Sequence, residues 1–340
     1  MEDLIMKTKV YFGTYTRGKS EGIYQAELDE NSGQLHNLQL LVKTNSPTYL
    51  GISKDFIYSV HKDGEQGGIA THHKSGQLIN TVLLDGAPLC HLFVDEKRSL
   101  VYGANYHKGQ ITVYRKKDDG ALALTDLVQL EGSGPHPNQK SAHAHFVGLT
   151  PDQYLVTCDL GTDTVTSYDI SAEGKLKPIA TYHSLPGAGS RHLVFHPKEK
   201  LAYLLCELNA QVEVLIYNGC GHFERLQTIS TLPENYQGDN ATAAVRISSD
   251  GKFLYTSNRG HDSIASFKIR KDGQLEKLEI VPCGGHIPRD FNISPSQDYL
   301  IVAHQESDNA SVFKRDKENG QLSLLSNDFY LPESICVFFD

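Results

Sequence analysis

A two-strand element that recurs seven times constrains this sequence more than any other feature. Its clearest copy joins the apolar run Arg191–Phe195, a turn at Pro197 and the apolar run Leu201–Glu207. Seven first-strand segments, 42, 54, 47, 52, 46 and 44 residues apart, centre on Tyr49, His91, His145, His192, Ala244, Asp290 and Ser334. Further strands follow each copy, often after a Gly-x-Leu turn such as Gly273–Leu275. Four strands at this spacing predict an all-β, seven-bladed β-propeller with four-stranded blades.

The two ends of the chain complete each other in this interpretation. The chain begins on a second-strand element, Val10–Thr14, and ends on an isolated first-strand element, Leu331–Phe339. We expect the C-terminal strand to complete the first blade and close the ring, because closure removes open sheet edges that would promote aggregation. We therefore expect a single domain over residues 1–340.

Composition limits the partners and the compartment. The 340 residues carry a net charge of −9 without a basic run, so a nucleic-acid partner is not expected. The six cysteines show no C-x-x-C spacing, which is typical of free thiols in a reducing compartment. The N-terminus carries Glu2 and Asp3 where a signal peptide needs bases, and no run approaches the length of a membrane helix. We expect a cytoplasmic protein, a monomer or weak homodimer, without a membrane partner.

Candidate site residues lie at two recurring positions of the repeat. In a propeller, the loops that enter first strands and those that leave second strands open on one face. Arg191 and Glu207, at the two ends of one strand pair, should meet there. The other candidates at these positions are His143, His145, Arg289, Asn105, Tyr106, Asp159, Asn258, Arg259, His304 and Gln305.

Each candidate also has a structural interpretation. His143 and His145 have i, i+2 spacing, so on a strand both rings point to one side; this suits a metal or an acid/base pair, but also a histidine bonded into a blade edge. Arg191 could bridge to a carboxylate of a neighbouring blade, and Arg259 could lie in a solvated turn. We interpret His192 and His196 as strand and turn histidines, and Asp163, Asp250 and Asp262 as turn formers.

One catalytic motif is rejected on its context. Gly18–Gly22 matches the G-x-S-x-G pattern of serine hydrolases, but a nucleophile elbow needs a strand that leads into a helix, and here the motif joins two strands. The sequence contains no dinucleotide fingerprint and no H-E-x-x-H motif, and no cofactor is expected.

The motifs together resemble those of the seven-bladed propeller lactonases, a family that contains cycloisomerase-type 6-phosphogluconolactonases and fungal carboxymuconate lactonizing enzymes. The resemblance spans nearly the whole chain. It rests on Gly13–Thr16, Asn105–Tyr106, Ser141–His145, Asp159–Asp163, Arg191–Pro197, Cys206–Leu208, Ser257–Ile264 and Pro288–Ile293. The chain departs from the pattern at Leu89–His91, where relatives often have Pro-x-His.

The resemblance implies hydrolysis of a sugar-acid lactone, most of all 6-phospho-D-glucono-1,5-lactone, a reaction of the pentose phosphate pathway. The positions that match the family's catalytic motifs are His143, Arg191, Glu207 and Arg259. On this hypothesis His143 or Glu207 is the general base and Arg191 stabilises the oxyanion. Arg259 and Arg289 bind the phosphate, with His145, Asn105 and Tyr106 as further substrate contacts.

Three alternatives stay open at this point. The same residue types could lactonize a muconate-like diacid. A metal-dependent lactonase could use His143, His145 or Asp159 as ligands, although we expect that the protein binds no metal. A non-catalytic scaffold for a protein partner would need an apolar top face, whereas the sequence places charges there. The anionic substrate is consistent with a net negative protein only if several arginines meet in one pocket.

Overall fold

The structure is a computed structural model, and it describes residues 7–340. Every regular element in that range is a β-strand, and the strands form seven antiparallel sheets of four strands each, which confirms the predicted blades. The chain divides into two compact units: residues 7–48 with 231–340 form unit 1, and residues 49–230 form unit 2. The single domain stays a prediction. Within the described range no helix could span a membrane.

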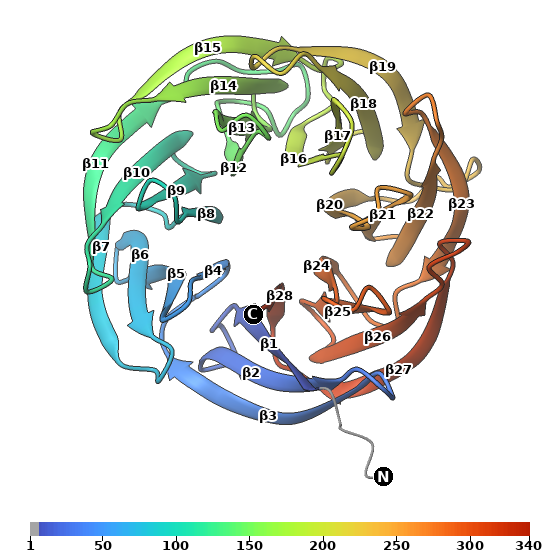
Figure 1. The fold of residues 1–340 in the computed structure, drawn as a ribbon, viewed down its shortest axis with the longest axis horizontal. Helices are drawn as coiled ribbons and strands as arrows, with labels where there is room; N and C mark the ends of the chain where they lie inside the picture. Colours follow the sequence, from blue (N-terminus) through green and yellow to red (C-terminus); the bar gives the residue numbers. More distant parts are fainter. Residues whose placement is uncertain (1–6) are drawn as a thin grey trace. The chain divides into compact units, whose positions relative to one another are not determined.

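Unit 2 contains blades 2 to 5, each built from four consecutive strands (Figure 1). Blade 2 consists of β4 (Leu50–Ile52), β5 (Phe56–Asp63), β6 (Gln66–His73) and β7 (Leu78–Asp85), and blade 3 of β8 (His91–Asp95), β9 (Leu100–Asn105), β10 (Gln110–Lys116) and β11 (Leu122–Gln129). Blade 4 consists of β12 (Ala144–Leu149), β13 (Leu155–Asp159), β14 (Thr164–Ile170) and β15 (Leu176–His183), and blade 5 of β16 (Ser190–Phe195), β17 (Leu201–Cys206), β18 (Gln211–Tyr217) and β19 (Phe223–Ser230).

Unit 1 contains blades 6, 7 and 1, and blade 1 combines both ends of the chain. Blade 6 consists of β20 (Ala241–Ile247), β21 (Phe253–Arg259), β22 (Ser263–Ile269) and β23 (Leu275–Pro282), and blade 7 of β24 (Pro288–Ile293), β25 (Tyr299–His304), β26 (Asn309–Arg315) and β27 (Leu322–Tyr330). Blade 1 consists of β28 (Ser334–Phe339), β1 (Lys7–Thr14), β2 (Gly22–Asp29) and β3 (Gln34–Lys43), in that order.

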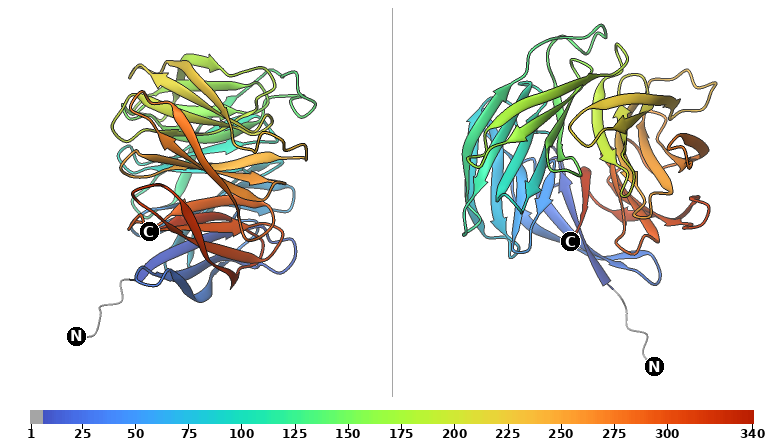
Figure 2. Two further views of the ribbon diagram at one scale, coloured as in Figure 1. Left: turned by 90° about the vertical axis from the view of Figure 1, so that its right-hand side faces the viewer. Right: turned by 45° about the horizontal axis from the view of Figure 1, so that its top comes forward.

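The C-terminal strand completes the first blade, as the sequence predicts. β28 pairs antiparallel with β1, and Val10 lies opposite Phe339. Figure 2 marks the C-terminal end of the chain beside the blue first strand. Asp290 of blade 7 fixes the strand from the side: its carboxylate accepts the Val337 N–H at 2.9 Å and a guanidinium N–H of Arg246 at 2.7 Å. One buried carboxylate therefore joins blades 6, 7 and 1.

The core lies between consecutive sheets. The apolar side chains of the second and third strands of one blade pack against the first two strands of the next, as Cys158 and Val165 do against Leu193 and Leu204. The fourth strands, by contrast, alternate between exposed and half-buried residues. Within each unit, the first two strands of a blade pack against the neighbouring blade, and this packing supports the loops at their ends.

Candidate functional site

A buried ion pair joins the two ends of the strand pair β16–β17. Arg191 Nε donates to Glu207 Oε2 at 2.7 Å, and the two side chains are 3% and 18% exposed. The pairing of Ser190 with Cys206 brings the two residues to the same end of the sheet, so the predicted meeting is confirmed. Glu207 belongs to the same blade as Arg191. This contact is therefore not a bridge between neighbouring blades.

A β-bulge aims the Arg191 side chain. Ser190 pairs with Cys206 and His192 with Leu205, which leaves Arg191 as the extra residue of the strand. The same one-residue shift leaves His145 as the extra residue of β12 and Arg289 as that of β24. Bulges redirect side chains and occur often beside active sites. Three of the predicted site residues therefore share a local geometry that strand alternation does not predict.

His143 and His145 meet on Tyr106, a residue of blade 3. The His143 ring stacks on the Tyr106 ring with centroids 4.4 Å apart, and the His145 ring meets the same ring edge-on at 5.8 Å. His143 lies just before β12 and His145 occupies the bulge. The expectation that strand alternation aligns the two rings is wrong, because only one of them lies on the strand; the aromatic ring aligns them instead.

The hydrogen bonding of His143 fixes its tautomer. His143 Nδ1 lies 2.9 Å from the carbonyl oxygen of Tyr106, and since a carbonyl only accepts, Nδ1 carries the hydrogen of the neutral ring. Nε2 then keeps a lone pair that can take a proton. The backbone N–H of His143 donates to Asp159 Oδ1 at 2.6 Å. A buried carboxylate thus fixes the backbone of His143, and burial raises the pKa of Asp159.

His192 connects the Tyr106 group to the ion pair. Its ring lies 5.2 Å from that of His145, and its Nε2 lies 3.3 Å from Arg191 Nη1. His91 approaches it from blade 3, also at 5.2 Å. We interpreted His192 as structural from the sequence, which missed its contact with the arginine. The available signal was the recurrence of His91, His145 and His192 in the first strands of three consecutive blades.

Asn105 supports the loops of the site. Its amide N–H donates to the Ala87 carbonyl at 2.7 Å, and its amide oxygen accepts the Lys108 N–H at 3.1 Å. The side chain is buried within this turn. Its contacts therefore fix the turn that carries Tyr106.

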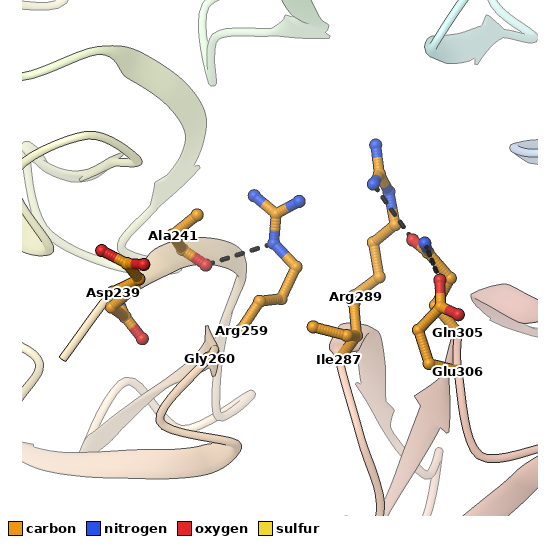
Figure 3. A pocket seen from close by; sticks show the side chains of 9 residues that line it. Asp239, Ala241, Arg259, Gly260, Ile287, Arg289, Gln305 and Glu306 are labelled. Carbon is orange, nitrogen blue, oxygen red and sulfur yellow. Dashed lines mark hydrogen bonds between the residues drawn. The ribbon is translucent and has the colours of Figure 1, made fainter.

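A separate pocket lies in unit 1 and contains the other two predicted arginines. It has a volume of about 570 Å³ and is lined by Asp239, Asn240, Ala241, Arg259, Gly260, Ile287, Arg289, Gln305 and Glu306. Figure 3 shows the guanidinium groups of Arg259 and Arg289 extending in the same direction. Arg259 donates to the carbonyl oxygens of Ala241 and Thr242 at 3.1 and 3.0 Å, and Arg289 donates to the amide oxygen of Gln305 at 3.2 Å.

These contacts to neutral oxygens orient the two guanidinium groups, and the carboxylates of Asp239 and Glu306 line the same pocket. Arg259 is the last residue of β21, and its side chain bonds to strand β20. The solvated turn that we considered for it begins one residue later, at Gly260. Two oriented guanidinium groups in one pocket form a binding site suited to a carboxylate or a phosphate.

Turn aspartates hold the segments that precede Arg191 and Arg289. The Asp163 carboxylate accepts the N–H groups of Gly187 and Gly189 at 2.7 and 2.6 Å, and Asp262 accepts the N–H of Ile287 at 3.0 Å. Both aspartates have positive φ angles, which confirms them as turn formers. Gly189 and Ile287, each two residues before a bulged arginine, have φ of 73° and 57°. A β-branched residue rarely adopts this conformation, so the backbone before Arg289 is strained.

Other candidates from the sequence have structural places. Ser20 of the G-x-S-x-G match is buried between β1 and β2 and bonds to Thr14 Oγ1 at 2.6 Å, so the motif joins two strands as predicted. Among the side chains of residues 7–340, no group of three or more His, Cys, Asp and Glu is arranged to hold a metal ion.

Comparison with known proteins places the chain in a family. Residues 9–339 match the family model described as "Lactonase, 7-bladed beta-propeller", so the chain belongs to the seven-bladed β-propeller lactonases. The 6-phosphogluconolactonase of Bacillus subtilis is 39% identical over 340 residues, which cover 97% of each chain.

Solved structures agree with this assignment. A protein from Lactobacillus plantarum superposes with a TM-score of 0.97 at 43% identity, over 98% of this chain and all of that one. The periplasmic gluconolactonase of Pseudomonas aeruginosa gives a TM-score of 0.93 at 30% identity, over 98% and 99% of the two chains. The family and these relatives support a hydrolase of sugar-acid lactones.

Proposed function

We propose that this protein hydrolyses 6-phospho-D-glucono-1,5-lactone to 6-phosphogluconate. The observation that carries the proposal is a cluster of unit 2 that contains an oriented histidine and an oriented arginine. The cluster in unit 2 contains a proton acceptor, His143, and an oriented guanidinium, Arg191, which are connected through the rings of Tyr106, His145 and His192. For the pocket of unit 1, we propose separately that Arg259 and Arg289 bind a phosphate.

In the chemical step, His143 Nε2 takes a proton from water as the water oxygen attacks the lactone carbonyl. The Tyr106 carbonyl favours this role because it holds the hydrogen on Nδ1. Arg191 donates to the oxygen on which negative charge develops. The intermediate then expels the ring oxygen, which receives the proton from His143, and the ring opens to the hydroxy acid.

Glu207 has a different part in this proposal. Its carboxylate is paired with Arg191 Nε, so the most direct use of its charge is to orient the guanidinium. Sequence reasoning left the base open between His143 and Glu207. The two contacts favour His143 as the base and Glu207 as the residue that positions Arg191.

The test is an assay of the purified protein with 6-phosphogluconolactone, with the rapid spontaneous hydrolysis subtracted. We expect His143→Gln to reduce the enzymatic rate about 10²-fold or more. His107→Gln is the matched control, because His107 is exposed and touches the same Tyr106 ring at 5.2 Å. A wild-type protein that fails to exceed the spontaneous rate would contradict the proposed function.

A metal-dependent lactonase and a lactonizing enzyme are the competing activities. Activity that survives exhaustive dialysis against a chelator, and is not raised by added divalent cations, removes the first. Incubation with a muconate-like diacid, followed by chromatography for the lactone, tests the second. We expect full activity after chelation and no lactone.

We also propose a cytoplasmic location and a place in the pentose phosphate pathway. All six cysteines are free thiols, which supports a reducing compartment. Fractionation of cells with an antibody against the protein tests the location, and loss of 6-phosphogluconate formation in a deletion strain tests the pathway.

A further inference from the structure

Two arginines of unit 1 flank one tyrosine ring. The guanidinium carbon of Arg17 lies 3.8 Å from the centre of the Tyr15 ring, and that of Arg289 lies 5.8 Å from it. The two guanidinium carbons are therefore at most 9.6 Å apart (3.8 Å plus 5.8 Å). Arg289 lines the pocket that Arg259 also lines, whereas Arg17 does not line it and is exposed. Arg17 thus lies just outside that pocket, on the side of Arg289.

The loop that carries Arg17 is held by one carboxylate. Glu333 accepts the backbone N–H groups of Arg17, Gly18 and Ser20 at 3.1, 3.0 and 3.0 Å, and its own carbonyl accepts the Tyr15 N–H at 3.0 Å. Glu333 comes directly before β28, the strand that completes blade 1. Its carboxylate oxygens therefore serve the backbone of the loop. Because the backbone of this loop is already fixed, only the side chain of Arg17 has to be ordered when it binds an anion.

The tyrosine ring orients both cations. A guanidinium above an aromatic face is attracted by the ring quadrupole, which fixes the plane of the fork without supplying a negative charge. Arg289 is held in addition by the neutral amide oxygen of Gln305. Two guanidinium groups within 9.6 Å of each other attract a dianion more strongly than they attract a monoanion. This favours a phosphate over a carboxylate.

We infer that Arg17, Tyr15 and Arg289 form the element that distinguishes phosphorylated from unphosphorylated sugar acids. The inference rests on the proposed function, because it assigns these residues to the phosphate end of the same substrate. Arg17 is neither one of the site residues predicted from the sequence nor one of the residues that line the pocket. Removal of Arg17 then weakens the binding of a phosphorylated ligand and leaves its unphosphorylated counterpart unchanged.

The test compares the binding of 6-phosphogluconate and of gluconate, which differ only in the phosphate, by titration calorimetry on the full chain. We expect Arg17→Ala to weaken 6-phosphogluconate binding about tenfold or more, the value of a charge-assisted contact, and to change gluconate binding less than about twofold. Arg17→Lys should recover only part of the loss, because an ammonium lacks the fork. Tyr15→Leu should fall between the wild type and Arg17→Ala.

The matched control is Lys19→Ala. Lys19 lies on the same exposed loop, and its ammonium pairs with Asp308 at 2.6 Å, so its removal changes the net charge equally. We expect both ligands to bind Lys19→Ala as they bind the wild type. Equal weakening by the two substitutions would show a general charge effect and would overturn the inference.

Other results overturn the inference or separate it from the proposed function. An Arg17→Ala protein that binds 6-phosphogluconate like the wild type overturns it, as does a wild type that prefers gluconate. If 6-phosphogluconate binds in an Arg17-dependent way but its lactone is not hydrolysed, the recognition element stands and the proposed activity fails. If the lactone is hydrolysed without any need for Arg17, the activity stands and the recognition element fails.

Discussion

The arginines of the two units differ in what they contact, and that difference separates two kinds of chemistry. In unit 2, Arg191 is buried and paired with Glu207. In unit 1, Arg289 is half-buried and bonds to the neutral amide oxygen of Gln305. A buried ion pair fixes the position of a guanidinium but balances its charge, whereas neutral contacts leave the charge to act on a ligand. The first arrangement suits the precise placement of a donor, and the second suits the capture of an anion.

The largest effect should follow removal of the strand that completes unit 1. We expect a chain truncated before Leu331 to lose cooperative folding, because the truncation exposes the β1 edge and removes both the Asp290–Val337 contact and the Glu333 support of the Arg17 loop. Solubility and thermal unfolding measure this. A soluble truncated chain that unfolds cooperatively near the wild-type temperature would contradict it.

The next largest effect concerns the paired arginine. Arg191→Ala should reduce kcat about 10²-fold or more, because it removes the proposed oxyanion donor and leaves Glu207 partly buried without its partner. Arg191→Lys should keep the charge and still lose most of the rate, since one ammonium cannot contact both the carboxylate and the substrate. Steady-state kinetics with 6-phosphogluconolactone tests this, and a near-normal kcat for Arg191→Ala would refute the role.

Low pH should destabilise the folded state through protonation of His304, a residue of unit 1. Burial lowers the pKa of His304 to about 4, below its ordinary value of about 6.5, so protons bind the unfolded chain more readily. The stability that the neutral ring contributes is complete above about pH 6.5 and is lost as the pH falls toward 4. We expect a loss of about 2 kcal/mol between pH 7.5 and pH 5.

Urea unfolding of the wild type and of His304→Gln at the two pH values measures this loss. The variant should show a pH difference smaller by that amount, whatever its stability at pH 7.5. The exposed His107→Gln serves as the control and should follow the wild type. An unchanged pH difference in His304→Gln would show that the ring is not the group concerned.

A smaller effect is expected for Arg289. Arg289→Ala should raise KM for the phosphorylated lactone about tenfold and leave kcat within a few-fold of the wild type, because the contact is proposed to hold the anion in the ground state and the transition state alike. Its KM should also depend less on salt than that of the wild type. A loss confined to kcat would place Arg289 with the chemical step and remove the contrast with Arg191.

The smallest effects should come from the two aspartates that hold the bulged arginines. We expect Asp163→Ala to lower kcat and Asp262→Ala to raise KM, each by about threefold to tenfold, because each loses hydrogen bonds that fix the backbone two residues before its arginine. The same kinetic assay measures both. An identical pattern in the two variants would indicate a general loss of stability.

Much of the fold could be predicted because each repeat is recognisable from short patterns of apolar and turn residues. Seven apolar strand pairs with turns between them require seven sheets, and the mismatched ends of the chain require β28 to join β1. The meeting of Arg191 and Glu207 was predictable for the same reason, since an antiparallel pair returns to the edge where it began. Asp163 and Asp262 were recognisable as turn formers from their neighbours.

Only the tertiary structure decided how the site residues are aimed. No sequence pattern marks the bulges that turn His145, Arg191 and Arg289 out of their strands, because a bulge depends on the register of two strands. The contact of His192 with Arg191 and the stack of Arg17 on Tyr15 also depend on side-chain positions. The sequence by itself thus determined the blades and their closure through local periodicity. Burial, strand register and the packing of rings against guanidinium groups decided how the charged side chains are oriented. These features arise only when distant segments of the chain pack together.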